Sequence, residues 1–596
     1  MIDKKSLKFW DNQKNLINWH KKPKKIILKK GKHYKWFPDG QLNISYNCID
    51  LNLKKGLGEK PAIIYIDSKW EEKIITFNKL NHLVVNFTEK IKTKSKKIKQ
   101  IMIHGSASIE TAVSMLACAR LAITHTVIFD ELHQNAILKR IKLLKPEVII
   151  TRTTDKNILN FFIKNSKIYK YKIIHLHTFN LNKKIKNLDI YKLSIKNIKI
   201  KKQIKFTKSN KHLFNLFTSG STGEPKGIVH SNGGYLIYSK YTCIKKFGMK
   251  KDSVVLCASD AGWINGHTYA LYGPLSIGAT TILIEKPVAI LNTKNLRNIL
   301  EKFKVTILYL PVTLIRMLRS IDHNLKYRSK HLRVLGSMGE PLASSIAKWY
   351  AQAFVKKNFP IVNTYFQTET GGILYSPNFN DKLKQKTYGT VGTSINGNLK
   401  LNVKKNENLK ELKVTRIWPG CMIDIINGEK IWDKYWDKNG DFKLFDLGKI
   451  NQNSCLIIKG RSDDVINIRG HRIGSEEIES ILLKIKDISE VSAIAVKDKF
   501  EGHKIVIFCS TTSKKTKKII TEINNHLFKY FGSFALPKKI YFLSSLPKTR
   551  SGKIIRRVMR EIFENPNKKI TELSTIINKN IIYEIKNKIT QDKKNN

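Results

Sequence analysis

One ten-residue segment carries the kinds of side chain that bind phosphate groups. Residues 218–227 read Thr-Ser-Gly-Ser-Thr-Gly-Glu-Pro-Lys-Gly, with three glycines, four hydroxyls and one lysine. Glycines let backbone N–H groups approach a phosphate closely, hydroxyls donate to its oxygens, and Lys226 adds a positive charge. The apolar run Leu213–Phe217 before it predicts a buried strand that delivers this loop. The alternative is a flexible Gly/Ser linker, but linkers rarely follow an apolar strand or end in Pro-Lys-Gly.

Strands and helices alternate on both sides of this loop. Asn78–Lys90 predicts an amphipathic helix with Asn78 as its N-cap, and Ser108–Leu121 predicts a helix of small residues. The alternation over residues 60–155, and again over 213–380, predicts largely parallel sheets covered by helices. β-branched runs give the expected strands: Ala62–Ile66, Lys73–Phe77, Lys99–His104, Thr126–Phe129, Glu147–Thr151, Val254–Ala258, Thr280–Ile284, Val305–Tyr309 and Arg333–Leu335.

The alternating pattern restarts after about residue 460. Strands are expected at Val491–Val496 and Lys504–Ser510, and helices at Gly474–Leu483 and Lys514–Phe531. The fold class is therefore α/β, with a large N-terminal domain of layered β-sheets and helices and a small mobile C-terminal α+β domain. The expected domains are 1–462 and 463–575, followed by a Lys/Asn-rich basic tail at 576–596 that frays, while 180–212 forms a surface excursion.

Length and charge narrow the class of protein. A chain of 596 residues with 41% hydrophobic residues needs more than one core. The formal net charge is +62, from 109 Lys and Arg against 47 Asp and Glu. The lysines are spread among isoleucines and asparagines instead of forming an arginine-rich block or an aromatic-studded basic face. This favours a solvated basic surface over a nucleic-acid groove, so we expect no nucleic-acid partner. The oligomeric state stays open.

Cysteine usage and hydropathy predict a cytoplasmic protein without a membrane partner. The seven cysteines lie far apart, with no CxxC pair and no zinc-ligand spacing. Reduced thiols are therefore expected, and no signal peptide is expected because the N-terminus lacks an apolar core. The segment Ala261–Ile284 lacks Asp, Glu, Lys and Arg and is long enough to span a bilayer. Its Asn265, His267 and Pro274 favour buried core and site lining instead.

Further motifs follow the phosphate-binding loop in order along the chain. They are Tyr365–Gly371, Gly460–Asp464, Arg472 and Pro547–Lys553. Together with the loop they resemble the acyl-adenylate-forming superfamily, and most closely its AMP-forming acetyl-CoA and propionyl-CoA synthetases. The resemblance runs from residue 6 to residue 565. Features typical of the short-chain branch are Trp36–Asn43, Met115–Arg120 and Gly262–His267.

The resemblance implies a two-step reaction. A carboxylate attacks the α-phosphate of ATP to give acyl-AMP and pyrophosphate, and the thiol of CoA then displaces AMP. We therefore expect an acid–thiol ligase that acts on acetate, with ATP and CoA as co-substrates and Mg²⁺ as cofactor. The alternatives are a propionate–CoA ligase, an adenylating enzyme whose acceptor is a carrier-protein thiol or an amine, and a basic nucleic-acid-binding protein that has kept the fold without the activity.

The resemblance also assigns the nucleotide site. Glu369 would hold Mg²⁺ with Thr218 as a second ligand, and the catalytic residues would be Lys553, Glu369 and Lys226. Asp446 and Arg461 would read the ribose hydroxyls, although Asp446 lies in Leu-Phe-Asp-Leu-Gly where the family usually has Gly-Asp-Gly. The expected ATP and AMP contacts are Thr218, Ser219, Gly220, Ser221, Thr222, Gly223, Gly339, Glu340, Pro341, Asn363 (usually Asp), Thr364, Tyr365, Phe366, Gln367, Thr368, Asp446, Arg461 and Arg472.

A rotation of the small domain would separate the two steps. Asp463 would be the hinge, because a charged linker residue can accept a large change of backbone angle while it stays solvated. Lys553 would reach the carboxylate and the α-phosphate during adenylation, and rotation would then withdraw it and bring Gly470 to the thiol tunnel. In a chain so rich in lysine, a solvated Lys553 is the alternative, but its setting in Pro-Lys-Thr-Arg-Ser-Gly-Lys favours the functional interpretation.

The acyl pocket would be lined by Ile264, Asn265, Met338 and Phe366. Acetyl-CoA synthetases typically have Val, Thr, Val and Trp at these positions. A buried ring cannot be displaced by a long acyl chain without overpacking, so Phe366 keeps the pocket short, although less so than Trp. The resemblance implies an acid of about two to four carbons, and because one methylene contributes only ~1–3 kcal/mol, acetate and propionate are not separated.

The expected CoA contacts, Asn265, Arg469 and Gly470, are less typical of the family. Relatives usually carry an Arg-x-x-Arg element after the strand at 147–151, whereas here Thr153–Asn157 contains no such pair. Other usual contacts are changed at Ala289 and Phe528, and Ile485 replaces a histidine that binds a structural metal in some relatives. The ATP half of the site is therefore better supported than the CoA half.

Overall fold

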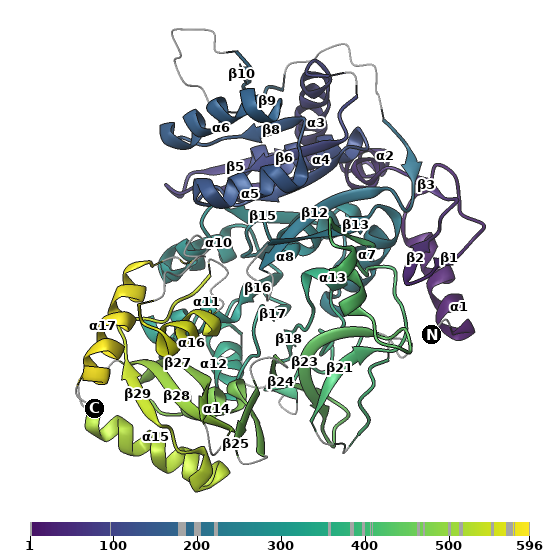
Figure 1. The fold of residues 1–596 in the computed structure, drawn as a ribbon. Helices are drawn as coiled ribbons and strands as arrows, with labels where there is room; N and C mark the ends of the chain where they lie inside the picture. Colours follow the sequence, from purple (N-terminus) through teal and green to yellow (C-terminus); the bar gives the residue numbers. More distant parts are fainter. Residues whose placement is uncertain are drawn as a thin grey trace.

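The chain forms a large N-terminal domain and a small C-terminal domain packed against its side (Figure 1). The α/β class predicted from the sequence is confirmed, including the large and small domains. The structure is a computed structural model, and it describes residues 3–95, 97–176, 186–195, 204–219, 225–355, 359–381, 387–395, 400–405, 407, 409–461, 465–468, 471–498, 502–511, 516–549, 554–567, 576 and 578–594.

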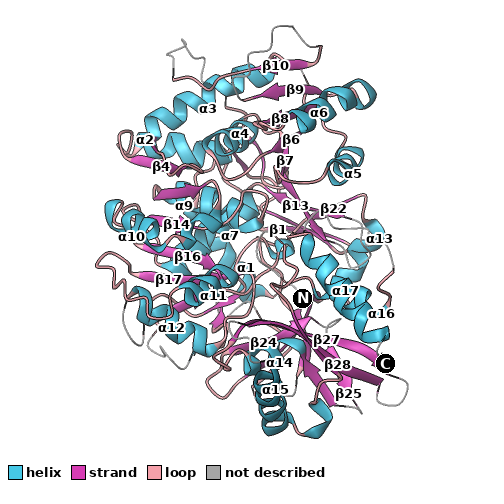
Figure 2. Cartoon of the chain, turned by 90° about the vertical axis from the view of Figure 1, so that its left-hand side faces the viewer, coloured by secondary structure: helices cyan, strands magenta, loops and turns pink. Residues whose placement is uncertain are grey.

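Two large sheets, seven-stranded and eight-stranded within the described residues, form the N-terminal domain. Figure 2 shows their strands in layers with helices flanking them. Most neighbours are parallel, as predicted, and antiparallel pairs lie toward one end of each sheet. The first sheet contains, in spatial order, β18 (Ile361–Asn363), β17 (Val334–Met338), β16 (Ile307–Pro311), β14 (Val254–Cys257), β15 (Thr280–Ile284), β4 (Pro61–Ile66) and β5 (Glu72–Thr76). The second contains β10 (Leu188–Ile190), β9 (Lys172–His175), β8 (Val148–Thr151), β6 (Gln100–His104), β7 (Thr124–Ile128), β12 (His212–Ser219), β13 (Pro225–Ser231) and β22 (Asp424–Ile426).

Strands that follow one another in the chain belong to different sheets, which the sequence did not predict. We expected the strands between residues 60 and 155 to share one sheet. Instead, β4 lies beside β15 in the seven-stranded sheet, with Ile63 opposite Thr281, while β6, β7 and β8 belong to the eight-stranded sheet. A β-branched run indicates that a segment is a strand but not which strand it will pair with. Part of the expected surface excursion, β10, is also an edge strand.

Helix α3 (Phe77–Lys92) begins one residue earlier than predicted, and Asn78 is not its N-cap. The cap is Thr76, whose hydroxyl accepts a hydrogen bond from the Lys79 N–H at 3.3 Å. The Asn78 amide instead donates to the Glu59 carboxylate at 2.6 Å. Helix α4 (Ile109–Arg120) begins as predicted after its cap Ser108, whose hydroxyl accepts from the Thr111 N–H at 3.1 Å. Threonine and asparagine are both good caps, so neighbouring candidates are not separated by sequence.

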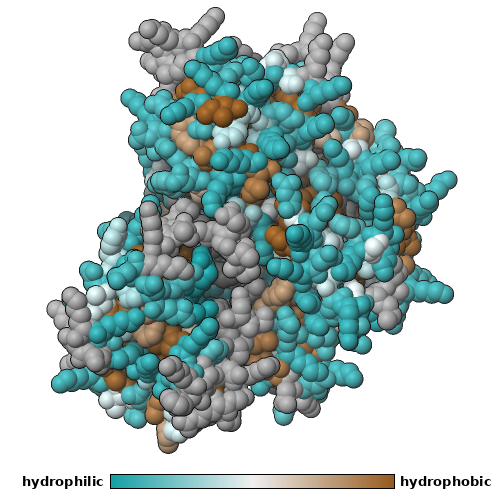
Figure 3. Space-filling view, viewed as in Figure 1, coloured by the Kyte–Doolittle hydropathy of each residue, from teal (hydrophilic) through white to brown (hydrophobic). Residues whose placement is uncertain are grey.

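The uncharged segment Ala261–Ile284 is buried core, as predicted. It folds into the short helices α8 (Ile264–His267), η3 (Thr268–Tyr272) and α9 (Gly273–Ile277), which lead into β15. Across the part of the chain that the structure describes, no helix combines the length and apolar character required to span a bilayer. Figure 3 shows hydrophilic residues over most of one face of the molecule.

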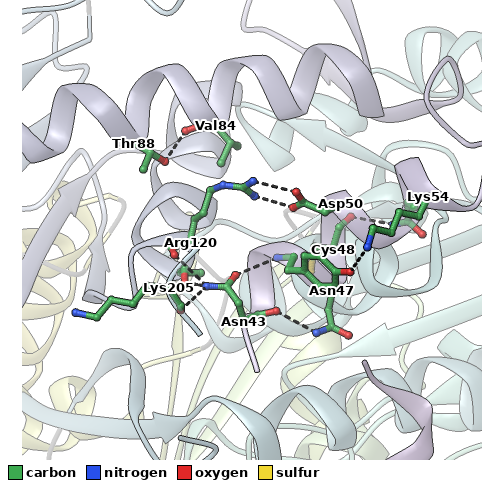
Figure 4. Close-up of polar contacts among 12 residues, drawn as sticks. Asn43, Asn47, Cys48, Asp50, Lys54, Val84, Thr88, Arg120 and Lys205 are labelled. Atoms are coloured by element: carbon green, nitrogen blue, oxygen red, sulfur yellow. Dashed lines mark hydrogen bonds and ion pairs between the residues drawn. The ribbon is translucent and has the colours of Figure 1, made fainter. Parts of the chain in front are cut away.

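A buried polar group, which we call the N-terminal clamp, consists of Asn43, Asp50 and Arg120 (Figure 4). The Arg120 guanidinium donates two hydrogen bonds to the Asp50 carboxylate, at 2.7 and 2.9 Å. The Asn43 amide donates to the carbonyls of Ala119, Arg120 and Lys205 at 2.9, 3.0 and 3.0 Å. The clamp therefore ties the segment before β4 to the end of α4.

The C-terminal domain contains a sheet of β25 to β29 covered by α14, α15 and α16, with cores on both sides of the sheet. The expectation of a frayed tail after residue 576 is wrong for residues 580–594, which form helix α17. Ile581, Ile582, Ile585 and Ile589 of α17 are buried against α16 and the sheet. The predicted boundary at 462/463 falls on residues outside the description and stays a prediction. The element bounds are β25 (Val465–Ile468), β26 (His471–Gly474), α14 (Ser475–Leu482), β27 (Ile488–Asp498), β28 (Gly502–Thr511), α15 (Thr516–Phe531), β29 (Lys539–Phe542), α16 (Arg556–Glu564) and α17 (Asn580–Lys594).

Candidate active site

A cavity of about 170 Å³ lies between the two domains. Its N-terminal wall contains eight of the residues predicted to contact the nucleotide: Gly339, Glu340, Pro341, Thr364, Tyr365, Phe366, Gln367 and Asp446. Its C-terminal wall comes from Glu476, Glu479, Ser480 and Leu483 on or next to α14, and from Ile554 and Arg556 at the start of α16. Ile554 directly follows Lys553 in the chain. Residues that are far apart in sequence therefore meet at the seam where the nucleotide was expected.

The predicted ribose pair lies on two adjacent antiparallel strands, β23 (Phe442–Ile450) and β24 (Leu456–Arg461), with Asp446 directly opposite Arg461. Asp446 Oδ2 accepts hydrogen bonds from the Tyr365 hydroxyl and from Gln367 Nε2, both at 2.6 Å. Gln367 Nε2 also donates to the Leu444 carbonyl at 2.6 Å. These donors fix the orientation of the Asp446 carboxylate before any ligand arrives.

The segment predicted to lie along the adenine turns sharply at Gly339, whose φ of +89° strains any residue with a Cβ. The next carboxylate, Glu340, forms an ion pair with Arg316 of α11 (Val312–Ile321) and accepts from the Thr313 hydroxyl at 3.1 Å. Burial lowers the pKa of Arg316, and the neighbouring carboxylates, Glu490 first among them, oppose that shift. Sequence reasoning missed Arg316, although an arginine within an apolar helical stretch was a usable signal.

Asn363 and Thr364 end up on different sides of the backbone. The Asn363 amide donates to the Thr390 carbonyl at 2.7 Å and accepts from the Ser337 hydroxyl at 3.0 Å, and its side chain does not line the cavity. Thr364 does line the cavity, and its hydroxyl is held by the Ser337 carbonyl at 2.8 Å and the Tyr309 hydroxyl at 2.7 Å. The structure therefore gives Asn363 a supporting position behind the wall.

The predicted metal ligand Glu369 lies in the short helix η5 (Thr368–Thr370). Its Oε1 accepts a hydrogen bond from the Tyr435 hydroxyl at 2.7 Å, and its carbonyl accepts from the Met422 N–H at 2.8 Å. Thr368 contributes its carbonyl, which accepts from His230 Nε2 at 2.8 Å. Burial lowers the pKa of His230 to about 4, so this imidazole is neutral at pH 7.

The predicted phosphate loop connects the antiparallel strands β12 and β13, in which Thr218 lies opposite Lys226. Sequence reasoning expected the buried strand at Leu213–Phe217, and all of its residues are buried. The Lys226 ammonium lies 5.7 Å from the centroid of the Tyr435 ring. Lys226 and Glu369 thus contact the same tyrosine. Tyr435 was missed because nothing in Lys-Tyr-Trp distinguishes it from an ordinary core aromatic residue.

Of the four predicted acyl-pocket residues, Phe366 lines the cavity between the domains, and Ile264, Asn265 and Met338 do not. Ile264 and Met338 are part of the same hydrophobic cluster, and Phe366 packs against it. The Phe366 ring meets the edge of Tyr269 at a centroid distance of 5.6 Å and an interplanar angle of 78°. Asn265 Oδ1 is buried and forms no hydrogen bond with any described residue. A buried polar atom without a hydrogen-bond partner among the described residues would be satisfied by a polar ligand atom.

Several predicted residues lie outside the described part of the chain. They are Gly220, Ser221, Thr222 and Gly223 of the phosphate loop, the hinge Asp463, the CoA contacts Arg469 and Gly470, and the catalytic Lys553. The backbones of Ser219, Arg461 and Arg472 belong to β12, β24 and β26, while their side chains are not described. The roles of all these residues stay predictions. Ile485 is buried in the C-terminal core, and no group of metal-ligating side chains occurs among the described residues.

Comparison with known families agrees with the geometry. The "AMP-binding enzyme" family matches residues 53–421, the "AMP-binding enzyme C-terminal domain" matches 477–553, and the "Acetyl-coenzyme A synthetase N-terminus" matches 3–48. An acetyl-coenzyme A synthetase of Leptospira biflexa is 32% identical, over 96% of this chain and 93% of that protein. One of Bdellovibrio bacteriovorus is also 32% identical, over 97% of this chain and 93% of that protein.

Solved structures show the same fold at low identity. The acetoacetyl-CoA synthetase of Streptomyces lividans superposes with a TM-score of 0.82 at 16% identity, covering 99% of this chain and 92% of that one. The anthranilate CoA ligase AuaEII, in complex with anthranoyl-AMP, gives a TM-score of 0.73 at 17% identity, covering 87% and 97%. The family profile spans more than half of the chain and the relatives span nearly all of it, so the chain belongs to the AMP-binding enzymes and, among them, to the acetyl-coenzyme A synthetase family.

Proposed function

We propose that the chain is an AMP-forming acetate–CoA ligase. In the first half-reaction an acetate oxygen attacks the α-phosphorus of ATP, the bond to the β-phosphate oxygen breaks, and acetyl-AMP and pyrophosphate form. In the second, the CoA thiolate attacks the acetyl carbon and AMP leaves. The observation that carries the proposal is the preorganised carboxylate Asp446, held by Tyr365 and Gln367 at the cavity, next to the Gly339–Pro341 turn.

Each wall of the cavity has a task in this scheme. Asp446 would accept hydrogen bonds from the ribose hydroxyls. The turn at Gly339 and the Tyr365 ring would hold the adenine. Lys226 and the backbone N–H groups of the 218–227 loop would meet the negative charge that builds up on the departing pyrophosphate. The Lys553 ammonium would bind both acetate and the α-phosphate, because a cation that contacts both reduces the repulsion between them.

The donor set at Glu369 suits Mg²⁺. This cation prefers oxygen ligands and usually takes only one or two from the protein, the rest being phosphate oxygens and water. The Glu369 carboxylate and the Thr218 hydroxyl would hold it. When bound, it would neutralise phosphate charge, while the orientation of Glu369 is set by the protein itself through Tyr435.

The acyl pocket supports acetate, with propionate as the near alternative. The Phe366 ring, which packs edge-on against Tyr269, would limit the length of the acyl chain. Ile264 and Met338 would offer no charged group to bind a larger polar acid. Free thiols at all seven cysteines support our further proposal that the enzyme works in the cytoplasm. We propose no nucleic-acid partner.

A second candidate, an adenylating enzyme with a carrier-protein thiol as acceptor, is favoured by one observation. The cation after β8, Arg152, is engaged by Glu285 and by Glu110, the latter at 3.8 Å, and Asp155 caps helix α6 (Lys156–Tyr169). Arg152 is therefore already paired with carboxylates and is not available to the phosphates of CoA.

The test is a panel of carboxylates, with and without CoA, in which pyrophosphate and AMP are followed separately. We expect acetate-dependent pyrophosphate release, and AMP release that requires CoA. Pyrophosphate without CoA-dependent AMP would select the second candidate, and no carboxylate-dependent pyrophosphate would refute both. Lys553→Ala is expected to reduce adenylation by several orders of magnitude and to spare thioester formation from supplied acetyl-AMP. Equal losses in both half-reactions would contradict the two-conformation scheme.

A further inference from the structure

Tyr435 is held rigidly at the edge of the predicted metal and phosphate site. It ends the short helix η7 (Asp433–Tyr435) and is only 4% exposed. Its ring stacks on Phe442 at a centroid distance of 5.6 Å and an interplanar angle of 20°, and meets Phe445 edge-on at 5.4 Å and 83°. The ring cannot turn without losing both contacts, so the position of its hydroxyl is fixed by packing.

The hydroxyl of this tyrosine orients Glu369. It donates to Glu369 Oε1 at 2.7 Å, the short distance typical of a charge-assisted hydrogen bond. The Glu369 backbone is fixed as well, because its carbonyl accepts the Met422 N–H at 2.8 Å. Within the described residues Oε2 receives no hydrogen bond, so the tyrosine determines which carboxylate oxygen is presented to a ligand.

The face of the same ring contacts Lys226. The ammonium lies 5.7 Å from the ring centroid, within the range of a cation–π interaction. Lys226 comes from the β12–β13 hairpin, far from η5 in sequence, and lies opposite Thr218 there. One side chain therefore contacts two groups of opposite charge, through its hydroxyl and through its ring.

We propose that Tyr435 is a positioning residue for adenylation, which sets the distance and orientation between the Glu369 carboxylate and the Lys226 ammonium. The inference rests on the proposed function, because the two groups are catalytic only in that scheme. Preorganisation matters here: a carboxylate that must be reoriented when metal and phosphates arrive loses part of its effect on the transition state.

A purely structural role would make Tyr435 resemble Tyr171. That residue is also buried, and its hydroxyl donates to the Phe162 backbone carbonyl at 2.8 Å. Tyr171 lies between α6 and β9, outside the proposed site. Tyr171→Phe is therefore a matched control: it removes one buried tyrosine hydroxyl and one hydrogen bond, without touching Glu369 or Lys226.

The experiment compares wild type, Tyr435→Phe and Tyr171→Phe in the full chain. Acetate-dependent exchange of pyrophosphate into ATP gives kcat and KM, and electron paramagnetic resonance measures the affinity for Mn²⁺ in the presence of ATP. We expect Tyr435→Phe to reduce the kcat of exchange about tenfold and to weaken Mn²⁺ binding several-fold, because a hydrogen bond to a charged group is lost. The KM for CoA in the overall reaction and the urea midpoint should match those of Tyr171→Phe.

Tyr435→Leu, which also removes the ring under Lys226, should weaken exchange further and raise the KM for ATP. If Tyr435→Phe matches Tyr171→Phe in both exchange and Mn²⁺ affinity, the inference is overturned. If wild type catalyses no exchange at all, the proposed function is wrong, and the comparison of Mn²⁺ affinities still decides whether Tyr435 positions Glu369.

Discussion

The molecule uses the same ion pair, an arginine with a carboxylate, in two different regions. In the N-terminal clamp, the Arg120 side chain is 0% exposed and Asp50 10%, and neither residue lines the cavity between the domains. At the cavity wall, Arg316 and Glu340 are 14% and 16% exposed and line the space between the domains. The clamp joins two parts of the fold, whereas the wall pair lies where we propose that the nucleotide binds. Residue chemistry alone therefore does not separate an ion pair in the interior of the fold from one at the proposed site; the position relative to the cavity does.

The largest effect is expected in the clamp. Arg120→Met leaves the Asp50 carboxylate buried without its partner, which costs about 3 to 5 kcal/mol of unfolding free energy. The urea midpoint should fall accordingly, while kcat/KM for ATP at low temperature stays within about twofold of wild type. Adding Asp50→Leu should restore much of the stability, because the unpaired charge is then gone. A loss of activity with unchanged stability would break the comparison.

At the wall, the expected effect is on catalysis. Asp446→Asn still accepts a hydrogen bond from Tyr365 or Gln367, but it has lost the charge proposed to bind the ribose. We expect kcat/KM for ATP to fall roughly tenfold to a hundredfold, since hydrogen bonds to charged groups contribute ~1.5 to 3 kcal/mol. Its urea midpoint should stay closer to wild type than that of Arg120→Met. The reverse order of midpoints would mean that the wall is mainly structural.

A substitution at Phe366, on the apolar part of the cavity wall, should have a smaller effect, and the effect should be on substrate specificity. Phe366→Ala opens space beside Tyr269, so kcat/KM for butyrate relative to acetate should rise about tenfold, as one methylene contributes ~1–3 kcal/mol. Competition between the two acids in the exchange assay measures this ratio. An unchanged ratio would mean that Phe366 does not limit the acyl chain.

The smallest expected effect is a dependence of stability on pH. Burial lowers the pKa of His230 to about 4, so the folded protein resists a proton that the unfolded chain accepts near pH 6.5. The contribution is complete above pH 6.5 and is lost as pH falls toward 4; the loss is about 1 kcal/mol by pH 5.5.

His230→Asn should make the urea midpoint less sensitive between pH 6.5 and 5, because Asn keeps an N–H donor for the Thr368 carbonyl but does not titrate. Some sensitivity will remain, since burial also lowers the pKa values of His125 and His267. An identical pH dependence in the variant would exclude His230 as a source.

Local sequence patterns predicted the elements better than their partners. Each β-branched run predicted as a strand overlaps a strand of the structure, because side-chain shape and burial act within a few residues. That β4 joins β15 instead of β6 depends on contacts between distant segments, which no short pattern encodes. Helix α17 was missed because its lysines and asparagines suggested a solvated tail, although its isoleucines at 581, 582, 585 and 589 have helical spacing.

The site was predicted to the extent that its residues lie in recognisable motifs. Asp446 and Arg461 do lie opposite each other, even though the Asp446 motif departs from the usual one. Arg316 and Tyr435 lie outside the motifs and reach Glu340 and Glu369 only through tertiary packing. Supporting residues of this kind are the hardest part of a site to predict from sequence, because their contacts form only when distant segments of the chain pack together.

The placement of β4 has a consequence for how the chain is made. Its strand partner β15 lies 218 positions further along, counted from Ile63 to Thr281 (281 − 63 = 218). At roughly 5–20 residues per second, a ribosome needs on the order of 10 to 40 s to synthesise that interval. For that time the β4–β5 hairpin presents an unpaired, isoleucine-rich edge in the nascent polypeptide. Biogenesis of this enzyme therefore includes a waiting period in which shielding by a chaperone would raise the yield of native protein.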